Sequence, residues 1–291
     1  MLEAAPRPRL ASASRLPLPE PAARAATLRR LAREHQLQRT TLRVVLCPGQ
    51  YDLLQTEAPP VADDELARAL RWSIRELLDY PADDALIETF ELPRHSVPGQ
   101  PRLLSVVAAR KAQITALLGE LADAGLEPAS IDIAELALRN LATACASRSG
   151  GEAELAPAIA SLFLLPQQTC VEITRQRLLL FTRQIAVAGE PLLHAAAGDA
   201  GRKQSRCEAI CLELQRSLDH FERHSGLGGV RRLQLFHGAG DSRTLAARAS
   251  EQLNIEVQRA DLAELLPGAK ALDPALLGAC LPAIGGALRG L

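Results

Sequence analysis

The sequence predicts an α/β protein from the alternation of its segments, and its length and composition show that the chain is globular. Segments rich in Val, Ile and Leu alternate with segments of helical periodicity along the whole chain. This alternation is typical of domains in which helices pack on a mixed or parallel sheet. The 291 residues are 47% hydrophobic and 23% charged. That is an ordinary globular composition, and a chain of this length can bury the cores of two domains.

The first half is predicted to contain four helices and five strands. The helices cover residues 27–38, 64–79, 111–124 and 135–146, and the strands cover residues 42–46, 51–57, 86–92, 103–109 and 130–133. Pro48 and Gly49 supply the turn between the first two strands, and a loop rich in proline and glycine separates the next two. We therefore expect a hairpin over residues 86–109.

The second half is predicted to open with three consecutive strands, at residues 159–165, 170–174 and 178–187. The elements after them are a long helix, a strand, a helix, a strand and a C-terminal helix, at residues 206–225, 232–236, 242–253, 255–258 and from 274 onward. Residues 147–151, Ser-Arg-Ser-Gly-Gly, separate the two halves. Small flexible residues are favoured at linkers because few contacts cross them, so we expect a domain boundary there.

Composition argues against several classes of protein. A formal net charge of -1 argues against a nucleic-acid binder, which normally needs a clustered excess of Lys and Arg. The apolar runs, such as residues 162–165 and 178–181, are too short to cross a bilayer. The first 30 residues lack the apolar core of a secretory signal, so we expect an irregular tail or one edge strand, with a transit peptide as the alternative. Six cysteines without a C-x-x-C pair indicate buried thiols in a reducing compartment.

Two cysteines and two histidines on the long helix are the most tempting metal ligands. At about 100° per residue, Cys207 and Cys211 point to one side of the helix, whereas His220 and His224 point to the opposite side. The cysteines instead belong to an apolar stripe that continues to Phe221, so we expect no metal site. The sequence contains no G-x-S-x-G, H-E-x-x-H or Walker A motif, and we expect no catalytic residue.

Trp72, the only tryptophan, lies on an unusual face of its helix. Leu66, Leu70, Ile74 and Leu77 define the stripe that should be buried, and Trp72 points about 160° away from the centre of that stripe. Two interpretations remain open: the ring packs against another part of the chain, or it belongs to a partner surface, where aromatic residues are enriched.

Three segments resemble a known family. They are ELARALRW continuing to DYPADD (residues 65–72 and 79–84), IDIAELALRNL (131–141) and LELQRSLD (212–219). In order and spacing they are similar to the MshI family of biogenesis proteins of mannose-sensitive haemagglutinin (MSHA) pili. That family is related to the type IV pilus assembly protein PilM, and the similarity runs from about Arg9 to Arg289.

The resemblance implies the two-lobed, actin-like fold of the FtsA and PilM type, with a strand and helix subdomain inserted in the first lobe. The first lobe would cover residues 27–149, with the inserted subdomain at about 42–125, and the second lobe residues 150–291. Residues 1–26 would be an irregular tail or a remnant of the third strand. The first hairpin of the fold would then be missing.

The resemblance also bears on nucleotide binding. Actin-like ATPases cradle phosphate and Mg²⁺ with two Asp-x-Gly loops, and neither is visible here. The second site reads Leu-Leu-Pro-Gln-Gln-Thr at residues 164–169, where proline removes an amide donor and no carboxylate is present. Part of the site that binds adenosine in the family has a counterpart here. The residues that resemble it are Glu213, Arg216, Ser217, Gly238 and Gly240. Alternatively, Arg216 faces only water and the glycines form a plain strand-to-helix turn.

The function implied is that of a non-catalytic cytoplasmic scaffold, peripheral at the inner membrane. It would bind the cytoplasmic tail of a PilN-like or MshJ-like pilus assembly protein, in a groove between the inserted subdomain and the rest of the first lobe. Arg71 and Trp72 are the candidate residues of that surface. The alternatives are an ATP-binding actin-like protein whose true start lies upstream of Met1, and a filament-forming protein of the same fold. No cofactor is expected, with ATP as the doubtful exception.

Overall fold

The computed structural model describes residues 2–3, 8–17, 20–91, 103–148, 157–189, 192 and 200–290. Contacts divide the chain into two compact units. The larger unit contains the N-terminal residues as far as Arg15 and the chain from Glu135 onward, and the smaller unit contains Leu16–Leu92 and the chain up to Ala134. The helix that follows Ala134 thus groups with the second half of the chain, whereas the predicted boundary at residue 150 comes after that helix.

A five-stranded sheet forms the centre of the larger unit, in the order β10-β9-β8-β11-β12. The strands are β8 (Ile159–Leu164), β9 (Thr169–Arg175), β10 (Leu178–Ile185), β11 (Arg232–Phe236) and β12 (Glu256–Arg259). β8, β9 and β10 form an antiparallel meander, and β8, β11 and β12 run parallel to one another. The three consecutive strands predicted from the sequence are therefore confirmed, as is the alternation of strand and helix after them.

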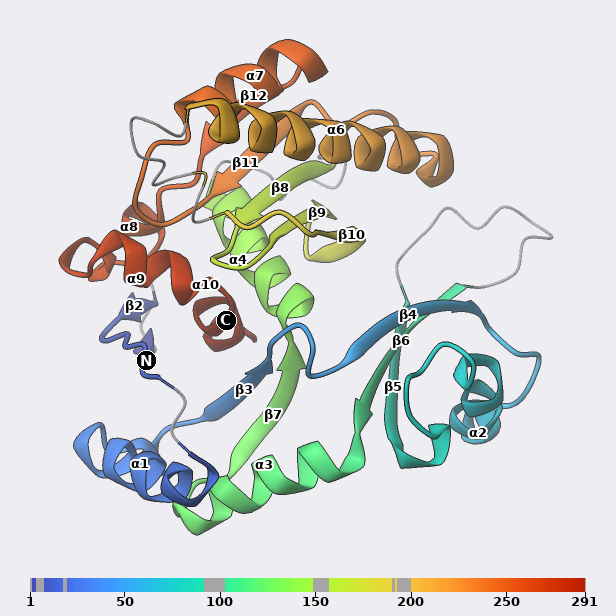
Figure 1. Ribbon diagram of the computed structural model, residues 1–291, viewed down its shortest axis with the longest axis vertical. Helices are drawn as coiled ribbons and strands as arrows, with labels where there is room; N and C mark the ends of the chain where they lie inside the picture. The colour runs from blue at the N-terminus through green and yellow to red at the C-terminus, as the bar shows by residue number, and fades with distance from the viewer. Residues whose placement is uncertain are drawn as a thin grey trace. The chain divides into compact units, whose positions relative to one another are not determined.

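Helices cover both faces of this sheet (Figure 1). On one face, α6 (Ala200–Ser225) and α7 (Arg243–Leu253) enclose an apolar core. On the other, α4 (Ala134–Arg148), α9 (Pro274–Ala279) and α10 (Leu281–Ala287) enclose a second core. Coverage of both faces explains why all six residues of β8, between its neighbouring strands, are buried and mostly apolar.

Short elements complete the larger unit. β1 (Leu2–Glu3) pairs with β2 (Arg9–Leu10), and the amide of Leu10 donates a 3.0 Å hydrogen bond to the carbonyl of Pro267. This contact anchors the N-terminal segment next to α8 (Leu262–Leu265) and the 3₁₀ turn Ala269–Ala271. The predicted single C-terminal helix is wrong, because the chain forms two helices, α9 and α10, that meet at Cys280, two residues before Pro282.

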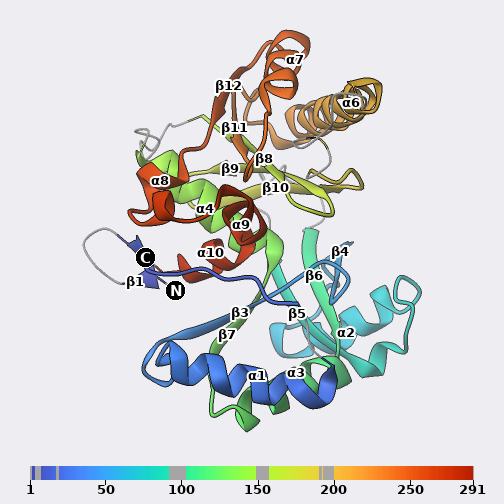
Figure 2. The ribbon, with the colours of Figure 1, turned by 60° about the vertical axis from the view of Figure 1, so that its left-hand side comes forward.

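The smaller unit contains two separate sheets (Figure 2). β3 (Leu42–Leu46) and β7 (Pro128–Ile133) form a parallel pair that packs on α1 (Pro21–Glu34) and α3 (Lys111–Asp123). β4 (Asp52–Glu57), β6 (Leu103–Arg110) and β5 (Ala85–Glu91) form an antiparallel sheet with β6 in the middle. α2 (Asp63–Ile74) covers it through Leu70 and Ile74, and 3₁₀ turns occupy Leu37–Arg39 and Ala82–Asp84.

The structure confirms the predicted hairpin, because β5 and β6 pair in antiparallel register. Three element ends differ from the prediction by five residues or more. α1 begins at Pro21 rather than at residue 27, since proline has the backbone angle of a first helical turn. α6 begins at Ala200 rather than at residue 206. α2 ends at Ile74, so the turn after it leaves Leu77 57% exposed instead of in the buried stripe.

The apolar stripe predicted for the long helix is confirmed. Cys207, Cys211 and Phe221 are at most 3% exposed and belong to the core between α6 and the sheet. Five of the six cysteine thiols are buried and Cys47 is exposed, so the expectation of buried thiols fails at that one position. Across the residues that the structure describes, no helix has both the length and the apolar character that a bilayer crossing requires.

Candidate functional sites

The β8–β9 turn contains residues 164–169, the segment expected at the second phosphate loop. The amide of Leu165 donates to the carbonyl of Gln168 at 3.0 Å, and the carbonyl of Leu165 accepts from the amide of Gly189 at 2.9 Å. Gly189 lies so close that a Cβ there would be 2.7 Å from the carbonyl carbon of Leu164. The amide of Leu165 is thus used within the turn, and Pro166 has no amide to offer a phosphate.

Glu213, Arg216 and Ser217 lie together on α6 and contact one another. Ser217 is fully buried, and its hydroxyl donates to the carbonyl of Glu213 at 2.7 Å. The Glu213 carboxylate accepts from Arg216 of the same helix and lies 3.2 Å from Arg183 of β10. Arg216 is exposed, so the side chain meets water as well as Glu213. Exposed pairs of this kind contribute little to stability.

The turn with Gly238 and Gly240 lies between β11 and α7, as its sequence predicts. A Cβ at Gly238 would be 2.4 Å from the carbonyl oxygen of Pro274, so the glycine permits α9 to approach this turn. Gly240 has φ +104°, a left-handed conformation that favours glycine. The contact with α6 is made by Lys203, whose ammonium lies 3.3 Å from the carbonyl of Asp241.

The two groups of predicted adenosine-side residues lie at different positions along α6. The first group belongs to the helix itself, around Glu213, whereas the turn contacts the helix at Lys203. Lys203 precedes Glu213 by ten residues, which is about 15 Å along the helix. Hydrogen bonds of His237 also hold the turn together. Its buried ring contacts the Ser242 hydroxyl at 2.7 Å and the Gly238 carbonyl at 2.8 Å. Burial and the nearby Arg259 lower the pKa of His237, so the ring is neutral at physiological pH.

A cavity of about 430 Å³ lies beside the Gly238 turn. Leu262, Leu272 and Leu277 provide apolar lining, and the charged lining residues are the cationic Arg259 and Lys270 and the acidic Asp261. The volume falls in the range of small-molecule pockets, and the lining suits an apolar body that carries an anionic group. Sequence reasoning missed this cavity because most of its walls come from residues 259–273, for which it predicted no element.

The four residues considered as metal ligands lie in different environments. Cys207 and Cys211 are buried, and burial raises the pKa of Cys211 to about 11, so the thiol stays protonated. The His220 and His224 rings stack with centroids 4.3 Å apart, and the His224 ring contacts the carbonyl of His220 at 2.7 Å. Within the described ranges, no group of three His, Cys, Asp or Glu side chains is placed to hold a metal ion.

Glu172 is a buried acid on β9, an inner strand of the five-stranded sheet. It is fully buried, and neither carboxylate oxygen has a hydrogen-bond partner. Burial, and then the nearby Glu135 carboxylate, raise the pKa of Glu172 well above its usual range, while Arg139 opposes the shift. Gln184 donates to Glu135 at 2.6 Å. Glu172 occupies a buried position of β9, where an apolar residue would be expected. The sequence of β9 therefore does not indicate that Glu172 lies near Glu135 and Arg139.

Arg71 and Trp72 lie on α2 of the smaller unit. Trp72 is 70% exposed, and the Arg75 guanidinium lies 5.0 Å from the centre of its ring. This exposure contradicts the interpretation in which the ring packs within its own unit. The Nε atom of Arg71 is buried and has no hydrogen-bond partner. The surface at this end of α2 thus presents a large apolar ring with the Arg75 guanidinium against it.

Comparison with known proteins now places the fold. No protein-family model matches the sequence, and no curated protein matches it. Among solved structures, the chain aligns with a chain of a PilM-PilN type IV pilus biogenesis complex at TM-score 0.72 and 21% identity. The alignment covers 99% of this chain and 94% of that one. The fold is PilM-like. The predicted fold class, the actin-like fold of the PilM type, is thereby confirmed.

Two other solved structures align less well with this PilM-like chain. The cytoplasmic domain of EpsL, an inner membrane component of the type II secretion system of Vibrio cholerae, matches at TM-score 0.49 and 15% identity, over 87% of this chain and 83% of that one. A Bacteroides thetaiotaomicron protein with an actin-like ATPase fold and unknown function matches at TM-score 0.47 and 8% identity, over 88% and 80%. Neither is close enough to carry an argument about function.

Proposed function

We propose that this protein is a non-catalytic cytoplasmic scaffold of type IV pilus biogenesis, of the MSHA type, that binds the tail of an inner-membrane assembly protein. The observation that carries the proposal is the fold match over nearly the full length of both chains with a chain of the PilM-PilN complex. The three sequence segments that resemble the MshI family point to the same system. The protein would reach the inner membrane through its partner.

The proposed absence of catalysis is supported by the β8–β9 turn. Hydrolysis of a nucleotide by an actin-like site needs backbone amides on the phosphate and a carboxylate to organise Mg²⁺. The turn from Leu164 to Thr169 contains no carboxylate, and Leu165 uses its amide internally. Gly189 fills the space behind the turn, so the loop could not open toward a phosphate without moving the chain that follows β10.

The proposed partner is the short cytoplasmic tail of a PilN-like or MshJ-like membrane protein, and the proposed surface is the one around Trp72 and Arg71. Tryptophan and arginine are the residues most enriched among those that dominate binding energy. Trp72 exposes most of its side chain to solvent, and the Arg75 guanidinium 5.0 Å from the centre of its ring supplies a cation beside it.

The test is a titration of the full chain with a synthetic peptide of the partner's cytoplasmic tail. Saturable binding at tens of micromolar or tighter is expected, equivalent to at least about 6 kcal/mol. Trp72→Ala should weaken it at least tenfold, since an aromatic anchor contributes about 2 kcal/mol or more. Leu212→Ala, at a leucine on α6 that is 48% exposed, is the matched control and should bind normally. Absence of saturable binding, or equal losses in both variants, would refute the proposal.

The second candidate is an ATP-binding protein, and the cavity beside Gly238 favours it. Its volume of about 430 Å³ and its two cationic residues could receive part of a nucleotide. A titration with ATP and Mg²⁺ distinguishes the two. The scaffold proposal expects no saturable binding of ATP, whereas binding that is lost in Arg259→Ala would favour the second candidate.

A further inference from the structure

A row of polar side chains crosses the five-stranded sheet of the larger unit. Cα pairing joins Thr182 to Glu172, Glu172 to Ser161, Ser161 to Gln234, and Gln234 to Gln258. Because paired residues share a face, the five side chains lie in one line across the strands. Ser161, Glu172 and Gln234 are each at most 4% exposed, and each has at least one side-chain oxygen without a hydrogen-bond partner.

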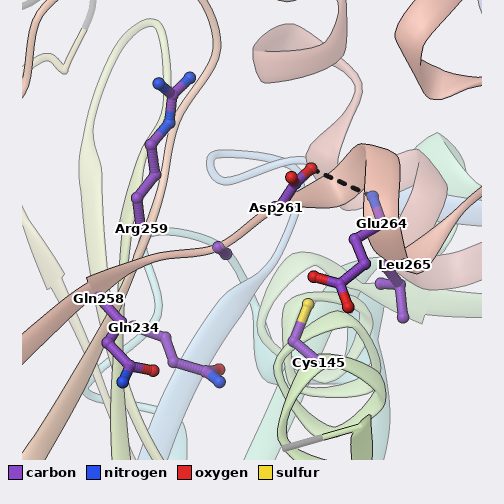
Figure 3. Close-up of a pocket in the computed structure, with 8 residues that line it drawn as sticks. Cys145, Gln234, Gln258, Arg259, Asp261, Glu264 and Leu265 are labelled. Carbon is purple, nitrogen blue, oxygen red and sulfur yellow. Dashed lines mark hydrogen bonds between the residues drawn. The ribbon is translucent and has the colours of Figure 1, made fainter.

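The Gln258 end of this row opens into a cavity of about 170 Å³ (Figure 3). Three of its lining residues are buried, namely Cys145 of α4, Gln234 of β11 and Leu265 of α8. Asp261 and Glu264 lie at its exposed edge. Figure 3 shows the Gln234 and Gln258 carboxamides side by side, and the Glu264 carboxylate beside the sulfur of Cys145.

The lining offers mainly hydrogen-bond acceptors. Gln234 is 4% exposed, and its buried Oε1 has no partner. Asp261 caps α8, accepting from the amides of Ala263 at 2.8 Å and Glu264 at 3.1 Å. The guanidinium of Arg259, the one cation in the lining, extends away from the two carboxamides (Figure 3).

Two properties restrict the occupant. Small-molecule pockets usually measure about 300–1,000 Å³, so a cavity of about 170 Å³ admits a group the size of one long side chain and not a nucleoside. A buried acceptor without a partner destabilises a fold unless water or a ligand supplies a donor. An anionic group would meet Asp261 and Glu264, whereas a cationic N–H donor would satisfy Gln234 and neutralise part of their charge.

We propose that this cavity is a binding site for an alkylguanidinium or alkylammonium group. The nitrogen donates to the Gln234 carboxamide, the Glu264 carboxylate balances the charge, and the alkyl stem lies against Leu265 and Ala260. The group belongs either to a free small molecule or to an arginine or lysine side chain of a peptide. The proposal is independent of the Trp72 surface, because every lining residue belongs to the larger unit.

The experiment is a calorimetric titration of the full chain with butylguanidinium, compared with butylurea, a neutral molecule of the same shape. Butylguanidinium should bind saturably and butylurea at least tenfold more weakly. A second arm uses a peptide with blocked ends, acetyl-Gly-Arg-Gly-amide. Binding of butylguanidinium alone identifies a free small cation as the natural ligand, and binding of both identifies a peptide side chain, so either result supports the proposal.

Two variants test the assigned residues. Gln234→Met removes the carboxamide with little change in volume, and Glu264→Gln removes the charge at the edge. Each should weaken butylguanidinium binding at least tenfold, whereas Glu251→Gln, at an exposed carboxylate of α7, should leave it unchanged. Without ligand, Gln234→Met should melt at the same or a higher temperature, because it removes a buried atom that lacks a partner. This melting measurement also verifies that the variant is folded.

Three results would overturn the proposal. They are no saturable binding of butylguanidinium up to about 10 mM, equal affinity for the neutral butylurea, and unchanged affinity in both cavity variants. In each case water alone would fill the cavity and satisfy Gln234.

Discussion

Strand β8 of the larger unit and strand β3 of the smaller unit are both short and apolar, and each has a parallel neighbour, yet their surroundings differ. All six residues of β8 are buried, whereas only one of the five residues of β3 is. β8 lies between neighbouring strands and under helices on both faces. β3 pairs with β7 alone in the sheet that the structure describes.

The difference shows that an apolar strand gains stability only from the layers that cover it. Parallel sheets in most proteins are covered on both faces, and a two-stranded sheet is marginal by itself. The core of the β3–β7 pair has four buried residues, while each core of the larger unit has many more. We therefore expect the smaller unit to open more readily, and four predictions test this comparison.

The largest effect is expected for Leu162→Ala in β8. Leu162 is fully buried in the core under α6, and removing a buried leucine leaves a cavity that costs about 3–5 kcal/mol. Urea unfolding followed by far-UV circular dichroism measures the loss. A loss below about 1 kcal/mol would contradict the view that β8 lies in a tightly packed core.

The same substitution, glycine to alanine, should have opposite signs in the two units. Gly238→Ala should destabilise by about 1–3 kcal/mol, because its Cβ would be 2.4 Å from the carbonyl oxygen of Pro274. Gly119→Ala on α3 has open space around its Cβ and should stabilise by about 1 kcal/mol through helix propensity. Thermal unfolding of both variants is the measurement, and shifts of the same sign would contradict the close packing at Gly238.

Burial in the larger unit should also create a pH dependence through Glu172. Its folded-state pKa is raised, so the folded protein holds a proton that the unfolded chain loses above about pH 4.3. Stability must then fall as the pH rises from that value toward the folded-state pKa, by up to about 1.4 kcal/mol per pH unit.

Glu172→Gln removes this proton linkage, so its stability should decline less steeply with pH than that of the unmodified protein. Urea titrations at several pH values above 4.3 provide the measurement. Glu251→Gln, an exposed residue of α7, is the control and should keep the original slope. Parallel curves for the unmodified protein and Glu172→Gln would show that Glu172 does not hold a proton in the folded state.

The smallest effect is expected for Leu42→Ala in β3, the matched partner of Leu162→Ala. Leu42 is only half-buried against the small core of α1 and α3, so the loss should be about 1–2 kcal/mol. Amide hydrogen exchange should show faster exchange in β3 and β7 than in β8, in both the variant and the unmodified chain. Equal protection of β3, β7 and β8 from hydrogen exchange would contradict the expectation that the smaller unit opens more readily.

Sequence reasoning predicted the kind of element at most positions and the turn that holds Gly238 and Gly240. It did not predict that Gly238 contacts α9, because that approach joins residues far apart in the chain. It also missed Gln234, which lines a cavity and has a buried Oε1 atom without a hydrogen-bond partner. The walls of that cavity come from α4, β11, β12 and α8, and no local pattern links these elements.

By itself, the sequence determined the periodic features: the hairpin of β5 and β6, the three-stranded meander, and the buried stripe of α6 with Cys207 and Phe221. These features depend on the spacing of apolar residues within one element or between elements adjacent in the sequence, and that spacing can be read from the sequence. Tertiary structure decided that β3 pairs with β7 rather than with β4, and that Trp72 is exposed. It also decided that a glutamate is fully buried on an inner strand of a sheet. Each of these features depends on which residues, distant in the sequence, pack against a given position. The local sequence around that position does not specify such contacts.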